Sequence, residues 1–151
     1  MSQIYTPGKL LLTLVNLVTM IAPYIADWKV NVETHIFNPN WPPHARYHNG
    51  QTMSMGLFIG IITFYVLYVV IPSTPSPSTQ LTHLTWIAVL HTLIYTSSLS
   101  GIMYPGAAWM DPEFGDGSPQ LYGFPIFVVL VWAGWGVERG RLRGLEVTKG
   151  L

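Results

Sequence analysis

Four apolar runs that contain no Asp, Glu, Lys or Arg constrain this chain more than any other feature. A helix needs about 20 mostly apolar residues to cross the hydrocarbon core of a bilayer, within a range of roughly 17–25. Proline is tolerated in such helices, so Pro23 and Pro125 do not exclude the first and fourth runs. The sequence therefore predicts an all-α, four-transmembrane-helix bundle, with apolar runs at 10–26, 53–71, 81–103 and 121–137.

The charge content agrees with a membrane protein. Only 9% of the residues are charged, against about 25% in a typical soluble domain. The net charge is zero, so no nucleic-acid partner is expected. The chain has no cysteine, which excludes disulfides, thiolate metal sites and cysteine nucleophiles. We expect one integral membrane domain over residues 1–151, with spans at about 10–26, 43–71, 81–103 and 121–137.

The connectors between the runs differ, and they give the bundle a direction. Residues 72–80 form a short, uncharged Pro/Ser link, whereas 27–50 and 104–120 are longer and carry polar residues. Basic residues gather in the tail after Val137, so the positive-inside rule puts both termini in the cytoplasm. We therefore expect two structured loops on the non-cytoplasmic face, in a membrane that we take to be the endoplasmic reticulum.

The segment from Thr34 to His48, THIFNPNWPPHARYH, carries the densest chemistry. Asn40 is the expected N-cap of a helix that starts near Pro42, because prolines suit the first helical positions. His44 and His48 are four residues apart and would share one face of that helix, with Gln51 continuing the face inward.

Three interpretations of this histidine cluster remain open. The first is a metal site formed by His44 and His48 and completed by His35 or a carboxylate such as Asp111. The second is acid–base catalysis on a lipid-soluble substrate. The third is interfacial architecture, because amphipathic side chains favour the headgroup region. No cofactor is expected, although heme with two axial histidines stays open.

The third run contains polar residues at bilayer depth. His91 lies near its centre and shares a helical face with Tyr95 and Ser98, while His83 lies near one end. An ionisable residue inside a span is a functional candidate by default. The alternative is a structural role, because polar side chains hydrogen-bond between membrane helices.

The second long loop holds three acidic residues among Pro and Gly. Asp111, Glu113 and Asp116 favour a solvated loop, and Gly115–Gly117 resembles a turn. One of the three remains a candidate catalytic acid, packed against Trp109 or Phe114.

The segment 27–51, with Asp27-Trp28 and the THIFNPNWPPHARYH motif, resembles an uncharacterised family of small four-span membrane proteins frequent in fungi. That resemblance implies a four-span fold and carries no activity. Four short spans with polar groups at one end are also distantly similar to emopamil-binding sterol isomerases and small fungal membrane-bound terpene cyclases. The chain is much shorter than those cyclases, and its spans lack the intramembrane carboxylates expected of acid-initiated cyclisation, which counts against direct membership of that group.

These observations favour a membrane enzyme that moves a proton on a terpenoid, sterol or polyketide-like molecule, by isomerisation or cyclisation. A non-enzymatic lipid-binding or complex-supporting protein is the alternative, a metal-dependent enzyme ranks third, and a homo-oligomer stays open. The predicted catalytic residues are Asp27, His35, His44, His48 and Asp111. The predicted substrate pocket comprises Trp28, Asn38, Trp41, Arg46, Tyr47, Gln51, His91, Tyr95 and Trp109.

Overall fold

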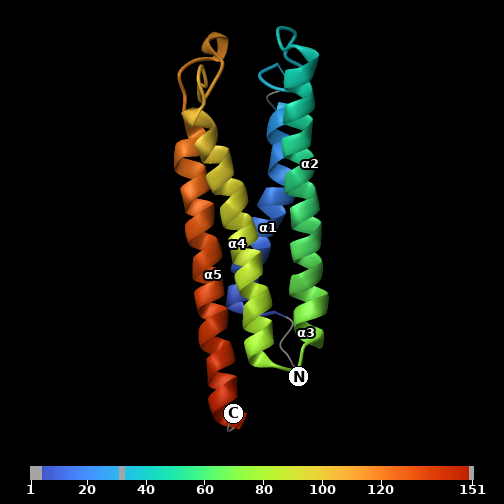
Figure 1. The fold of residues 1–151 in the computed structure, drawn as a ribbon, viewed down its shortest axis with the longest axis vertical. Helices are drawn as coiled ribbons and strands as arrows, with labels where there is room; N and C mark the ends of the chain where they lie inside the picture. Colours follow the sequence, from blue (N-terminus) through green and yellow to red (C-terminus); the bar gives the residue numbers. More distant parts are fainter. Residues whose placement is uncertain (1–4, 31–32, 150–151) are drawn as a thin grey trace.

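A computed structural model describes residues 5–30 and 33–149. The chain there is an up-and-down helical bundle (Figure 1). Within the described residues, four helices are long and apolar enough to cross a membrane, which confirms the predicted fold class. They are Pro7–Trp28, Pro43–Ser73, Pro77–Met103 and Pro119–Thr148. The elements are α1 (Pro7–Tyr24), η1 (Ile25–Val30), α2 (Pro43–Tyr65), η2 (Val66–Val70), α3 (Ile71–Ser73), α4 (Pro77–Ser100), η3 (Gly101–Met103), η4 (Pro112–Phe114) and α5 (Pro119–Lys149).

The bundle has two distinct ends (Figure 1). The loop end holds residues 25–30, 33–42 and 101–118, together with the first turns of α2 and α5. The terminal end holds the first turn of α1, the link between α3 and α4, and the last turns of α5. Four spans thus return the chain to the end where it begins.

Helix starts follow from local capping. Thr6 and Ser76 each accept a backbone N–H three residues on, from Lys9 and Thr79, and each is followed by a proline. Asn40 does not cap α2, contrary to prediction: Pro42 holds the N-cap position, with no side-chain cap. The Asn40 side chain instead donates to Glu113 across the loop end.

Two helical segments extend further than the apolar runs suggest. Helix continues to Ser73 and resumes at Pro77, so the Pro/Ser link shrinks to residues 74–76. The basic segment after Val137 is not a separate tail, because α5 continues through it to Lys149. The charged groups of the terminal end are therefore held on a helix.

Helix α1 is the centre of the packing, since it contacts both α2 and α5, while α4 packs on α5 and touches α2 at few points. Glycines allow α1 to approach both α2 and α5 closely. A Cβ on Gly56 would lie 2.8 Å from the Thr19 carbonyl oxygen, and one on Gly134 would lie 2.9 Å from the Gly8 oxygen. Pro23 cannot hydrogen-bond the Thr19 carbonyl, and the widened π-helical turn η1 follows it.

Candidate functional site at the loop end

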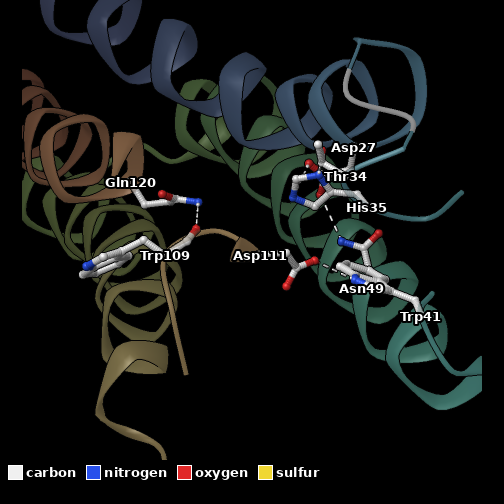
Figure 2. Close-up of polar contacts among 8 residues, drawn as sticks. All are labelled: Asp27, Thr34, His35, Trp41, Asn49, Trp109, Asp111 and Gln120. Carbon is white, nitrogen blue, oxygen red and sulfur yellow. Dashed lines mark hydrogen bonds and ion pairs between the residues drawn. The ribbon is translucent and has the colours of Figure 1, made fainter. Parts of the chain in front are cut away.

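At the loop end, the imidazole of His35 lies between a carboxylate and a hydroxyl. Asp27 Oδ1 lies 3.6 Å from Nε2 of His35. On the other side of the ring, Nδ1 of His35 lies 2.7 Å from Thr34 Oγ1. The side chains of His35 and Asp27 are 32% and 19% exposed, so the group is half-buried yet open to approach. Figure 2 shows the three side chains converging.

Helix α2 fixes the carboxylate of this group. Asn49 Nδ2 donates to Asp27 Oδ2 at 3.1 Å, which leaves Oδ1 facing His35. Two buried polar atoms on the same helix, Asn49 Oδ1 and Arg46 Nε, have no hydrogen-bond partner among the described residues. Buried polar atoms without a protein partner are rare in folded proteins.

The two long loops are joined by hydrogen bonds from amide and indole donors to carboxylates. Trp41 Nε1 donates to Asp111 Oδ2 at 2.9 Å, and Asn38 Nδ2 donates to Glu113 Oε1 at 3.2 Å. Asn40 Nδ2 reaches the other oxygen of Glu113 at 3.3 Å. We call these five residues the loop clasp. The clasp connects the segment after α1 to the segment before α5, so both long loops are structured.

Asn38 is the buried member of the clasp, with 1% of its surface exposed. Its Oδ1 accepts from the backbone N–H of Asn40 at 2.8 Å, and its backbone oxygen accepts from Arg46 Nη2 at 2.7 Å. Arg46 therefore holds the loop backbone in place through this hydrogen bond. Asn38 and Arg46 were predicted as pocket residues, and the structure places both in the support of the loop.

One aromatic ring packs against the Asp27–His35–Thr34 group, and a second pair of rings lies in the same segment of the chain. The His35 and Trp41 rings meet edge to face at 5.9 Å, and Trp28 meets Phe37 at 5.7 Å. A surface hollow of about 570 Å³ opens beyond the clasp. Its lining is acidic and aromatic, and comprises Glu33, Phe37, Pro39, Asn40, Glu113 and Phe114.

His44 and His48 form a second imidazole pair, separate from His35. Their Nε2 atoms are 3.0 Å apart on the first two turns of α2, and both side chains are exposed. His48 Nδ1 lies 3.1 Å from Gln51 Oε1, and the Tyr47 ring stacks on His44. Over the described part of the chain, no three His, Asp or Glu side chains are placed to share a metal ion. His35 is thus not brought to this pair.

Three predicted pocket residues lie away from this site. Trp109 lies with Gln120, which donates to its backbone oxygen at 3.3 Å, at a distance from the Asp27–His35 pair (Figure 2). His91 and Tyr95 are buried inside the bundle at 1% and 5% exposure. Among the described residues, no hydrogen bond or ring contact joins any of the three to His35.

His91 belongs instead to a polar network among three spans. Its Nε2 lies 3.1 Å from Asn16 Oδ1, which also accepts from Thr63 Oγ1 at 2.7 Å. Asn16 Nδ2 donates to the Gly60 carbonyl at 3.0 Å. Tyr95 pairs in the same way with Thr19 of α1, at 2.7 Å. This arrangement supports the structural interpretation of His91.

Sequence reasoning missed several residues of the two polar regions. Thr34 and Asn49 complete the Asp27–His35 group, and Asn16 anchors the inner network. Glu138 is 0% exposed between α1 and α5, where it accepts hydrogen bonds from Thr6 and, at 2.8 Å, from Arg141. One sequence feature could have indicated that Glu138 is buried: it directly follows an apolar run and lies near Gly134 and Gly136 on the same helix.

Fold and site together define an integral membrane protein with four spans and a histidine-bearing polar end. The chain belongs to a family of unknown function, DUF6640, whose profile matches residues 11–149. This agrees with the expected uncharacterised family. No curated protein and no solved structure matches the chain.

Proposed function

We propose that this protein is a membrane enzyme that moves a proton on a hydrophobic small molecule, in an isomerisation or cyclisation. The observation that carries the proposal is the His35 ring held between the Asp27 carboxylate and the Thr34 hydroxyl, with ring-to-partner distances of 3.6 and 2.7 Å. A carboxylate beside an imidazole orients the ring and stabilises its protonated form. Terpenoid, sterol or polyketide-like olefins are the substrates we propose, because the Trp41 ring packed against His35 offers an apolar contact.

The direction of the relay follows from which partner each nitrogen of the His35 ring faces. His35 Nε2 faces Asp27, so Nδ1 and the Thr34 hydroxyl are the groups through which a proton passes to or from substrate. In an isomerisation, protonated His35 gives its proton to one carbon of the olefin and then takes a proton from another carbon of the resulting cation, so the double bond moves and His35 is protonated again. No oxidant or cofactor is required for this step, because electrons stay within the substrate.

The Trp41 ring gives the site a group that can stabilise a positive charge on the substrate. Trp41 lies against His35, and its indole is fixed by Asp111. An indole face stabilises a nearby cation by about 0.5–2 kcal/mol. Trp41 would thus stabilise a carbocation formed on protonation, and Asp111 acts as a positioning residue for Trp41. His44 and His48 stand outside this relay.

Solvent deuterium gives a direct test. Protein in nanodiscs is incubated in D₂O with a hydrophobic extract of its source cells and with a panel of isoprenoid and sterol olefins. The proposal expects an isomeric or cyclised product carrying a solvent-derived deuterium. His35→Ala and Asp27→Asn should slow its formation about 10²-fold or more, the usual contribution of acid–base groups. Thr34→Val tests the relay, and His83→Ala on α4 is the matched control.

We also propose that the loop end is non-cytoplasmic, in the endoplasmic reticulum membrane. The loop end carries two basic and five acidic residues, whereas the terminal end carries five basic and two acidic residues. The excess of Lys and Arg near the spans marks the cytoplasmic side. A glycosylation site inserted after Gly106 should be modified in microsomes, and one appended at the C-terminus should not.

A non-enzymatic role in binding a lipid or a partner protein is the second candidate. Exposed aromatics favour it, because Tyr47, Tyr104 and Tyr122 at the loop end are 62–70% exposed. This candidate predicts a stoichiometric partner on gentle purification and no deuterated product. A product whose formation depends on His35 would exclude it.

A further inference from the structure

The exposed histidine pair on α2 is unused by the proposed proton relay. The geometry points to a two-histidine site for a divalent transition-metal cation, Cu²⁺ or Ni²⁺ ahead of Zn²⁺, formed by the Nε2 atoms of His44 and His48. The inference is independent of the proposed function, which rests on Asp27, Thr34 and His35.

The spacing of the two nitrogens fits shared ligation. Imidazole nitrogens bind such ions at about 2.0–2.1 Å. The two Nε2 atoms are 3.0 Å apart. An ion bound to both at a bond length of about 2.05 Å would have a nitrogen–ion–nitrogen angle of about 94°. This is close to the right angle between neighbouring ligands in square-planar or octahedral coordination. Tetragonal nitrogen and oxygen sites favour Cu²⁺ and Ni²⁺.

The tautomer of His48 is set by a neighbour. Gln51 Oε1 lies 3.1 Å from Nδ1 of His48, so Nδ1 carries the proton and Nε2 keeps its lone pair. Metal-ligating histidines almost always have their other nitrogen bonded in this way. Without a metal, His44 Nε2–H donates to that lone pair, and a cation would replace the shared proton.

The site is accessible from the aqueous side of the membrane. The α2–η2–α3 helix has 31 residues and would be about 46 Å long at 1.5 Å per residue, whereas the hydrocarbon core is about 30 Å thick. Its apolar run begins at Met53, so the excess length lies in the polar turns that carry the histidines. Both rings are exposed, which leaves the remaining coordination positions to water.

Titration of purified protein tests the inference. The full chain, carrying a tag without histidine and stripped with chelator, is titrated with NiCl₂ by calorimetry and with CuCl₂ by electron paramagnetic resonance. We expect one ion per chain and a copper spectrum with two nitrogen ligands. His44→Ala and His48→Ala should each weaken Ni²⁺ binding about tenfold or more, which corresponds to about 1.4 kcal/mol. Gln51→Leu should weaken it about tenfold through the lost orientation of His48.

The matched control keeps the number of histidines. His44→Ala combined with Tyr47→His places the imidazoles at adjacent positions, which do not face each other on a helix. That variant should bind like His44→Ala, while His35→Ala and His83→Ala should bind like the unchanged protein. Wild-type affinity in the relocated variant, or no stoichiometric binding by the unchanged protein, would overturn the inference. Because every substituted side chain at the pair is exposed, circular dichroism should show unchanged helix content throughout.

Discussion

The indole of Trp41 donates a hydrogen bond of 2.9 Å to the carboxylate of Asp111, a residue 70 positions further along the chain. It connects the loop that leads into α2 with the loop that leads into α5. The two halves of the bundle pack on each other mainly through α1 and α5, and the loop clasp adds a second connection at the loop end, where α2 and α4 touch at few points.

Replacing the indole donor should loosen the clasp without unfolding the bundle. Trp41→Phe keeps an aromatic ring and removes the N–H, so Asp111 loses its strongest donor. We expect faster amide hydrogen exchange in residues 104–118 and an unchanged rate within α1. Trp86→Phe is the control, because Trp86 is 62% exposed on α4. Equal exchange in both variants would contradict a connecting role for Trp41.

The α1–α5 contact should be intolerant of a single added methyl group. A Cβ at Gly134 would lie 2.9 Å from the backbone oxygen of Gly8, so Gly134→Ala should destabilise the protein by about 1–3 kcal/mol. Gly136 lies two residues along and has nothing within 4 Å of its Cβ position. Gly136→Ala should be neutral or stabilising by up to about 1 kcal/mol. Thermal unfolding in one detergent compares the two, and matching midpoints would contradict the close approach.

The buried carboxylate of Glu138 should be costly to remove. Glu138→Ala leaves Arg141 and the buried Lys9 without this neighbouring negative charge, and breaking a buried pair costs about 3–5 kcal/mol. Glu146→Ala removes a carboxylate that is only partly buried on the same helix and should cost far less. Folded yield and the unfolding midpoint measure the difference. A mild effect of Glu138→Ala would mean that the carboxylate does not hold α1 to α5.

The inner network should contribute to stability rather than turnover. Asn16→Val removes the oxygen that faces both His91 and Thr63, and membrane hydrogen bonds are worth about 0.6–2 kcal/mol each. We expect a lower unfolding midpoint and unchanged metal binding at His44 and His48. Thr96→Val is the control, because Thr96 bonds only within its own helix in the described structure. Destabilisation by both variants alike would argue against the network.

The sequence predicted the spans well because membrane insertion depends on local properties, namely the length and apolarity of each run. The start of α2 near Pro42 was found for the same reason, since Pro42 and Pro43 act locally. The N-cap assignment to Asn40 was wrong, because Glu113 in the other loop competes for that side chain. A partner 73 residues away leaves no trace in the local pattern.

The candidate site was predicted in part. Asp27, His35 and Asp111 were all predicted as catalytic residues, and the structure places Asp27 beside His35. The predicted grouping of His35 with His44 and His48 is not present in the structure. Residue 35 belongs to a loop and residue 44 to a helix, and only the tertiary structure fixes how the two pack. The burial of Glu138 was missed because it depends on the approach of Gly8 to Gly134, which are 126 positions apart.

The glycine contact between α1 and α5 has a consequence for biosynthesis. Helix α1 emerges from the ribosome more than a hundred residues before the helix that covers Gly8 and Lys9. During translation these groups have no α5 to pack against, so the nascent chain enters the membrane with an unfinished interface. Completion must wait for the last helix, so the α1–α5 interface is among the last of the helix contacts to form.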